Sequence, residues 1–111
     1  MNIQIYGRNK CFDTKKAERW FKERGIRFQS VDLARYGLSV GELQSVLRAV
    51  GGVDALIAPR AKGAEVLRYL AHDEDKVQRL LDDPALLRTP IVRNGKQATV
   101  GFCPDVWKTW E

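Results

Sequence analysis

Cys11 is the residue whose type and position in this sequence best suit chemistry. It follows an alternating polar and apolar segment at residues 2–6 and precedes an amphipathic segment at residues 13–24, so we expect it in a loop at the start of a helix. The free N–H groups and the dipole of a helix N-terminus favour a thiolate over a thiol. The sequence therefore predicts a lowered pKa for Cys11 and a nucleophilic thiolate. The alternative, a small buried apolar residue, conflicts with its polar neighbours.

Basic residues surround Cys11 in the sequence: Arg8, Lys10, Lys15 and Lys16. Together with the helix N-terminus they would hold an oxyanion beside the sulfur. The chain has a net charge of +5, which suits an anionic substrate or an acidic partner and equally fits an ordinary charged surface. It carries no helix-turn-helix or base-stacking motif, so direct binding of nucleic acid is not expected.

Thr14 stands where the second cysteine of a C-x-x-C motif would be. A threonine cannot resolve a mixed disulfide, but its hydroxyl can donate a hydrogen bond to the Cys11 thiolate. Thr14 can equally be a helix N-cap, and both interpretations stay open. Cys103 is the other cysteine of the chain, and we expect a structural or unreactive thiol there. One histidine and two distant cysteines predict no metal site.

The order of predicted elements gives the fold class. Period-two segments predict strands at residues 2–6, 26–31, 90–93 and 97–100, and Asn94-Gly95 predicts a type I′ turn between the last two. The first two strands and the helix between them form a parallel βαβ unit. The sequence thus predicts an α/β protein with a thioredoxin-like fold, a four-stranded mixed sheet with a helical insertion.

The region between the two strand pairs reads as mainly helical. Ser39 and Glu42 have the spacing of a capping box, a short helix is expected over Val66 to Leu70, and another begins near Asp73. We expect one domain over residues 1–111, with residues 38–86 as the insertion. The chain has no apolar run near the roughly 18 residues of a membrane span, and its first residues do not resemble a signal peptide. We therefore expect a cytoplasmic protein without a membrane partner.

The chain resembles the ArsC/Spx family in an ordered set of segments. These are Ile5-Tyr6, residues 9–17 (NKCFDTKKA), 56–60 (LIAPR), 87–92 (LRTPIV) and 100–102 (VGF). The family includes glutaredoxin-linked arsenate reductases and Spx-type transcription regulators. The resemblance extends over nearly the whole chain.

The reductase branch of the family implies a thiol-dependent oxidoreductase with Cys11 as the nucleophile. Such enzymes attack a small oxyanion, arsenate, and are regenerated by glutathione and a glutaredoxin-like partner, so glutathione is the expected co-substrate and no tightly bound cofactor is expected. Three arginines hold the oxyanion. Arg60 matches the first, Arg88 lies one place before the usual second position, which is Thr89 here, and the third position, near Phe102, has no arginine. We expect Arg60 to approach Cys11, with Arg8 or Arg88 as a second contact.

The regulator branch implies a different function, the binding of the α-subunit of RNA polymerase without catalysis. Many of these regulators carry a C-x-x-C switch, which Thr14 removes here. A third interpretation is a member that keeps the fold and has lost the oxyanion chemistry.

Pro90 matches the proline that is usually cis in the thioredoxin fold and faces the cysteine. A cis Thr89–Pro90 bond would leave the Thr89 backbone free to pair with an extended thiol such as glutathione. The alternative is a trans proline that only begins a strand.

Overall fold

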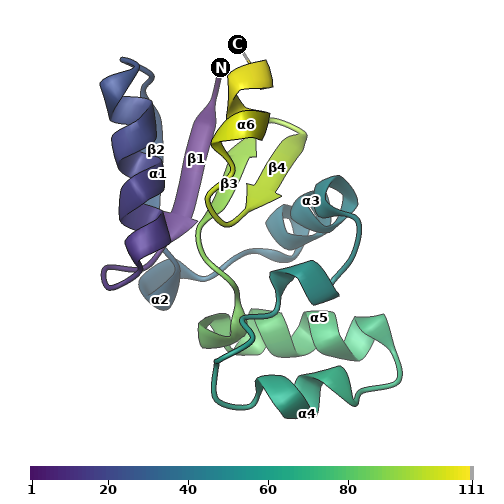
Figure 1. Ribbon diagram of the computed structural model, residues 1–111. Helices are drawn as coiled ribbons and strands as arrows, with labels where there is room; N and C mark the ends of the chain where they lie inside the picture. Colours follow the sequence, from purple (N-terminus) through teal and green to yellow (C-terminus); the bar gives the residue numbers. More distant parts are fainter. Residues whose placement is uncertain (111) are drawn as a thin grey trace.

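The computed structural model describes residues 1–110 and contains a four-stranded sheet in the order β2-β1-β3-β4 (Figure 1). The central strand β1 (Ile3–Gly7) pairs in parallel with β2 (Phe28–Asp32) and antiparallel with β3 (Ile91–Asn94). β3 in turn pairs antiparallel with β4 (Gln97–Val100). This is the mixed sheet of the thioredoxin-like fold predicted from the sequence.

Two details of the strands differ from the prediction. The second strand begins at Phe28, because Ile26 belongs to the turn after the first helix and donates its N–H to the carbonyl of Phe21. The hairpin loop is Gly95-Lys96 and not Asn94-Gly95, because Asn94 is paired with Gln97 in the ladder. Of the loop residues only Gly95 has a positive φ, 62°, so the predicted type I′ turn is wrong and one glycine at the first loop position is enough.

Six helical segments connect β2 to β3. They are α2 (Leu33–Tyr36), α3 (Val40–Val50), η1 (Asp54–Leu56), α4 (Ala64–Arg68), α5 (Asp73–Asp82) and η2 (Pro84–Leu86). The predicted capping box opens α3: Ser39 and Glu42 exchange both hydrogen bonds. The helix expected to reach Leu70 ends two residues earlier, at Arg68. None of the helices in residues 1–110 has the length and apolar character needed to cross a membrane.

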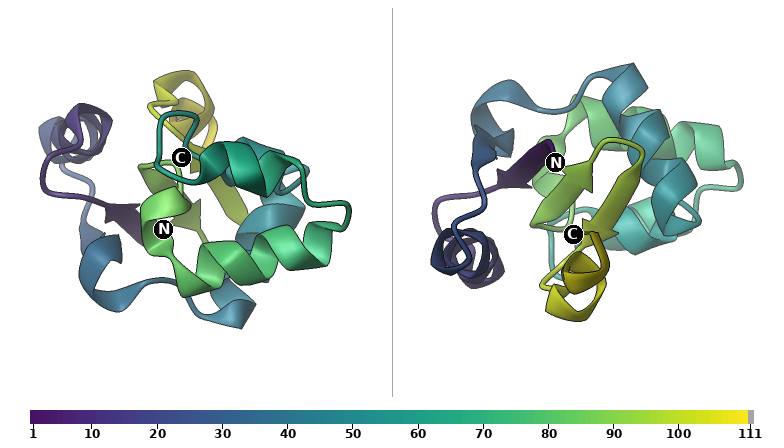
Figure 2. Two further views of the ribbon diagram at one scale, coloured as in Figure 1. Left: turned by 90° about the horizontal axis from the view of Figure 1, so that it is seen from below. Right: turned by 90° about the horizontal axis from the view of Figure 1, so that it is seen from above.

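Helices cover both sides of the sheet (Figures 1 and 2), and each side has its own apolar cluster. On one side, α1 (Phe12–Glu23) and α6 (Pro104–Trp107), which continues into η3 (Lys108–Trp110), cover the sheet. Their cluster, called here the tryptophan cluster, contains Ile3, Ile5, Ala17, Trp20, Phe21, Val92, Trp107 and Trp110. On the other side α3 covers β3 and β4, while α4 and α5 lie beyond the end of the sheet where β1 ends.

A polar network joins the first turn of α3 to the sheet. Tyr6 donates its hydroxyl proton to Glu42 at 2.5 Å, and Arg93 donates to the Tyr6 oxygen at 3.3 Å. Arg93 Nη1 lies 3.9 Å from the Glu42 carboxylate and Nη2 donates to Ser45 at 3.4 Å. A partly buried carboxylate thus has both a hydroxyl and a cation as partners, which holds α3 against β1 and β3.

Candidate functional site

Cys11 is the N-cap residue of α1, at the end of the loop that follows β1. The segment before β3 comes to the same place, because β1 and β3 are neighbours in the sheet and run in opposite directions. Thr89 in that segment donates its hydroxyl proton to Cys11 Sγ at 3.1 Å, and Sγ lies 3.8 Å from the Thr89 carbonyl oxygen. Two residues far apart in the sequence therefore make the immediate surroundings of the thiol.

The pKa of the Cys11 thiol is lowered. Burial by itself would raise it, but the nearby Thr14 hydroxyl, the hydrogen bond from the Thr89 hydroxyl and the backbone N–H groups of Thr14 and Asp13 all stabilise the thiolate and together outweigh burial. The direction is the one that the sequence predicts. The nearby hydroxyl and N–H donors are the cause, whereas the lysines expected to contribute are exposed, where water screens their charge.

Thr14 is not the N-cap of α1, so that interpretation of the sequence is wrong. It is the third residue of α1, and only 5% of its surface is exposed. Its Oγ1 is buried and has no partner of ordinary hydrogen-bond geometry. A hydroxyl proton turns freely about its C–O bond, so this group is available as a donor when Cys11 becomes a thiolate.

Gly7 allows α1 to come this close to β1. A Cβ atom at Gly7 would lie 2.2 Å from Thr14 Cγ2 and 2.5 Å from Thr14 Oγ1, far inside van der Waals contact. The first turn of the helix therefore rests directly on the backbone at the end of the strand. Any side chain at residue 7 would push Thr14 and the Cys11 loop outward.

The Thr89–Pro90 peptide bond is cis, as predicted, and Pro90 is buried. The Pro90 carbonyl accepts a hydrogen bond from the Gly101 N–H at 2.8 Å. The segment after β4 is thereby placed next to the segment that contacts Cys11.

The predicted arginines gather in one open hollow of about 370 Å³ beside the thiol. Arg8, Arg60 and Arg88 line it together with Asp13 and Thr89. Cys11 does not line the hollow itself; Thr89 connects the two. Arg60 is exposed, and the Arg8 guanidinium donates a hydrogen bond to the carbonyl of Pro84.

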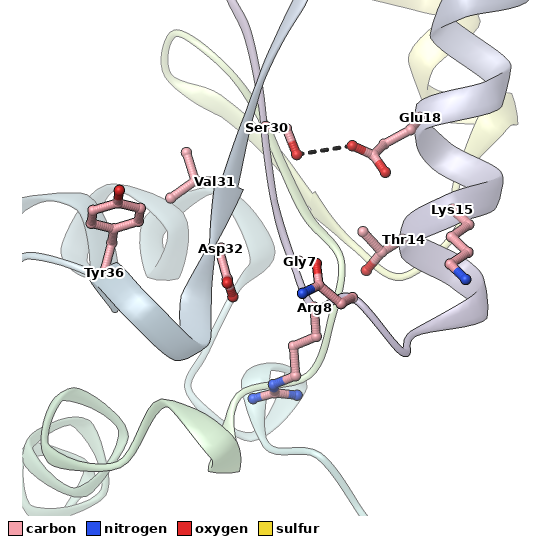
Figure 3. A pocket seen from close by; sticks show the side chains of 10 residues that line it. Gly7, Arg8, Thr14, Lys15, Glu18, Ser30, Val31, Asp32 and Tyr36 are labelled. Carbon is pink, nitrogen blue, oxygen red and sulfur yellow. Dashed lines mark hydrogen bonds between the residues drawn. The ribbon is translucent and has the colours of Figure 1, made fainter.

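A second hollow, of about 270 Å³, lies on the other side of Thr14, between α1 and the ends of β1 and β2 (Figure 3). Glu18 accepts a hydrogen bond from Ser30 at 2.9 Å across its upper wall, and Asp32 and Tyr36 face it from the opposite side. Its charged lining, Arg8, Lys15, Glu18 and Asp32, is balanced.

Cys103 has a different environment from Cys11. Burial raises the pKa of its thiol, which the charge of Arg88 and a hydrogen bond from Thr99 only partly oppose. The thiol donates to the Val100 carbonyl at 3.3 Å and packs against the tryptophan cluster. A protected thiol is what the sequence predicts at this position.

Three features of the site were not predicted from the sequence. The Thr89 hydroxyl is a direct partner of Cys11, whereas a role was expected only for its backbone. Gly7 is required by the close approach of Thr14, which a glycine between a buried strand and a helix could have suggested. Phe12, to which the sequence assigned no role, is the first residue of α1 and is 81% exposed beside the thiol.

The sequence of this chain is similar to a known protein family and to known proteins. The model of the ArsC family matches residues 6–110. The global transcriptional regulator Spx 2 of Oceanobacillus iheyensis is 38% identical over 110 residues, which cover 95% of this chain and 80% of that protein.

Two solved structures share the fold. A putative ArsC family related protein from Bacteroides fragilis has a TM-score of 0.87 at 20% identity and covers 100% of this chain and 98% of its own. An arsenate reductase from Vibrio cholerae has a TM-score of 0.84 at 23% identity, with 96% and 94% covered.

Proposed function

The chain belongs to the ArsC family, and on that basis we propose that it is a thiol-dependent oxidoreductase in which the Cys11 thiolate is the nucleophile. The observation that carries the proposal is the hydrogen bond from the Thr89 hydroxyl to Cys11 Sγ, at the start of α1, which together with the nearby Thr14 hydroxyl and backbone N–H groups lowers the pKa of the thiol. A thiol held in this way is ionised to a greater extent at a given pH than an ordinary cysteine and therefore attacks electrophiles faster.

The proposed substrate is a small oxyanion such as arsenate. The thiolate displaces a hydroxyl group of the oxyanion, which leaves as water, and a sulfur–arsenic bond forms. Glutathione then attacks the Cys11 sulfur, the sulfur–arsenic bond breaks with its electron pair moving to arsenic, and arsenic(III) is released as arsenite. The two thiols have supplied the two electrons, and a Cys11–glutathione disulfide remains. A second thiol, from glutathione or a glutaredoxin-like protein, restores Cys11.

Arg60 is the proposed anion contact, with Arg8 and Arg88 as secondary contacts. All three line the hollow beside Thr89, and a guanidinium suits a tetrahedral oxyanion because it donates two parallel hydrogen bonds. Thr14 is proposed to stabilise the thiolate, and the Thr89 backbone beside Pro90 to pair with the bound glutathione.

The test is a coupled reductase assay with arsenate, glutathione and glutaredoxin. We expect turnover that is abolished in Cys11→Ser and kept in Cys103→Ser, and a raised KM for arsenate in Arg60→Ala but not in Arg48→Ala. An unreactive Cys11 would refute the proposal. A reactive Cys11 without arsenate turnover would refute the oxyanion as the substrate, and glutathione-dependent thiol exchange would remain as the proposed reaction.

A second candidate function rests on the 38% identity to a transcriptional regulator. In this case the chain binds the α-subunit of RNA polymerase and has little catalytic activity. A binding measurement with purified α-subunit separates the two functions. Tight binding that Cys11→Ser leaves intact, together with no turnover, favours the regulator; turnover without binding favours the oxidoreductase.

A further inference from the structure

Phe12 is an aromatic residue that does not contribute to the hydrophobic core. It is the first residue of α1 and follows Cys11 directly, yet 81% of its surface is exposed and it belongs to neither apolar cluster. An aromatic side chain in water gives up the free energy that its burial would supply. An exposed aromatic residue marks an interface with another protein when further apolar side chains accompany it on the same surface.

A second exposed aromatic residue continues the surface. Lys16 lies one turn after Phe12 on the same side of α1, and its ammonium group is 5.9 Å from the centre of the Phe102 ring. Phe102 is 39% exposed and is held edge-on against Trp107 with ring centres 5.5 Å apart. Phe12, Lys16 and Phe102 are called here the aromatic strip, whose first residue directly follows Cys11 in the chain.

The surroundings of the strip are strongly basic. Six cations come from the Cys11 loop, the first turns of α1 and the arginine hollow: Arg8, Lys10, Lys15, Lys16, Arg60 and Arg88. Within residues 1–110 none of them forms an ion pair. Asp13 is the only carboxylate in residues 8–16. An excess of unpaired positive charge around an apolar strip is complementary to an acidic partner.

We propose that the aromatic strip docks an acidic segment of another protein that carries a disulfide next to an apolar side chain. The inference rests on the proposed nucleophilic Cys11 thiolate and gives it a second class of substrate, a protein disulfide, beside the small oxyanion. The Cys11 thiolate attacks one sulfur of the bound disulfide, a Cys11–partner disulfide forms as the original S–S bond breaks, and the second sulfur leaves as a thiolate that takes a proton from water. The apolar side chain of the partner packs on Phe12, and its carboxylates face the cations.

Synthetic peptides test the docking. One short peptide has a cysteine beside a leucine and between glutamates, capped as a mixed disulfide with mercaptoethanol; a matched peptide has lysines in place of the glutamates. Single-turnover rates are measured with both and with hydroxyethyl disulfide, which is small and neutral. We expect the acidic peptide to react about tenfold faster than the basic one at low salt, and this preference to shrink as salt is added.

The variants locate the effect. Phe12→Ala should lower the ratio of the acidic-peptide rate to the hydroxyethyl disulfide rate at least about fivefold, whereas Tyr69→Ala should leave that ratio unchanged. Tyr69 is a matched control because it is 88% exposed on the insertion, just after α4. Equal rates for the two peptides, or an equal effect of both variants, would overturn the proposal.

A binding measurement separates this inference from the proposed function. In Cys11→Ser no exchange can occur, so amide NMR shifts are followed while the acidic peptide, with serine in place of its cysteine, is added. Shifts centred on Phe12 and Phe102 support the docking surface even if the thiol proves unreactive. Shifts elsewhere, or tighter binding of a single-stranded oligonucleotide than of the peptide, would contradict it.

Discussion

Thr89 Oγ1 lies 3.1 Å from Cys11 Sγ, so a hydroxyl from the segment before β3 donates to the thiol at the start of α1. The sulfur bears a full charge only as a thiolate, and a hydrogen bond to a charged acceptor is stronger than one to a neutral acceptor. The bond therefore favours ionisation and links the reactivity of Cys11 to the position of β3.

Replacing Thr89 by valine should slow the reaction of Cys11 with iodoacetamide at pH 7 by about two- to tenfold, because one stabilising donor is lost and the pKa of Cys11 rises. Thr89→Ser keeps the hydroxyl and should react like the wild type. The measurement is a pH series of alkylation rates, and equal curves for valine and wild type would show that the Thr89 hydroxyl has no part in ionisation.

Replacing Thr14 by valine should separate stability from reactivity. The buried Thr14 hydroxyl has no partner, so at pH 6 its removal should raise the free energy of unfolding by up to about 1 kcal/mol, while alkylation of Cys11 slows. Thr99→Val is the control, because Thr99 accepts the Trp107 indole N–H at 2.8 Å and its loss should cost about 1–3 kcal/mol. Urea unfolding measures the free energy of unfolding of both variants. A large decrease for Thr14→Val would mean that the Thr14 hydroxyl already has a hydrogen-bond partner in the folded protein.

Replacing Gly7 by alanine should destabilise the protein by about 1–3 kcal/mol, because the new Cβ would overlap Thr14 and displace the first turn of α1. Cys11 should lose reactivity in the same variant, since its donors move with that turn. Gly41→Ala is the matched control: Gly41 is the second residue of α3 and has open space around it, and alanine there should stabilise by up to about 0.5–1 kcal/mol. An unchanged free energy of unfolding in Gly7→Ala would disprove the close approach of Thr14 to Gly7.

Glu42 should make stability depend on acid pH. Burial alone would raise the pKa of its carboxyl, but hydrogen bonds from Tyr6 and Ser39 and the charge of Arg93 outweigh burial and lower it. The carboxylate thus stabilises the fold above its unfolded pKa of about 4.3, and this contribution is lost as the pH falls through the lower folded value. Unfolding curves of wild type and Glu42→Gln should differ at pH 6 and converge in acid; a constant difference would refute the linkage.

Local sequence signals predicted much of the fold. The Ser39 and Glu42 capping box depends on residues near one another in the chain, and it is present. The cis bond at Pro90, expected from the match to the thioredoxin fold, is present as well. The hairpin was placed correctly, but its loop was not, because the register of β3 on β4 pairs Asn94 with Gln97. Loop type depends on that register, which a dipeptide alone does not determine.

The site was less predictable because its contacts are long-range. That Cys11 begins a helix follows from neighbouring residues, but the Thr89 hydroxyl reaches it from 78 positions away. Thr14 could be either a cap or a donor until the path of β1 placed it against Gly7. The exposure of Phe12 depends on which side of α1 packs on the sheet, and the residue lies too close to the helix start for periodicity to show it.

The distribution of the tryptophans gives the molecule a built-in optical label for one half of its core. All three lie in the tryptophan cluster, and the insertion has none, whereas the insertion contains Tyr69 and borders Tyr36. Tryptophan fluorescence, excited at wavelengths too long for tyrosine to absorb, therefore reports on the layer formed by α1, α6 and the sheet. Far-ultraviolet circular dichroism also registers α3, α4 and α5. If the polar network through Glu42 breaks first on heating, the circular dichroism signal will change at a lower temperature than the tryptophan fluorescence. The helices of the insertion then unfold while the layer that contains the thiol site stays folded.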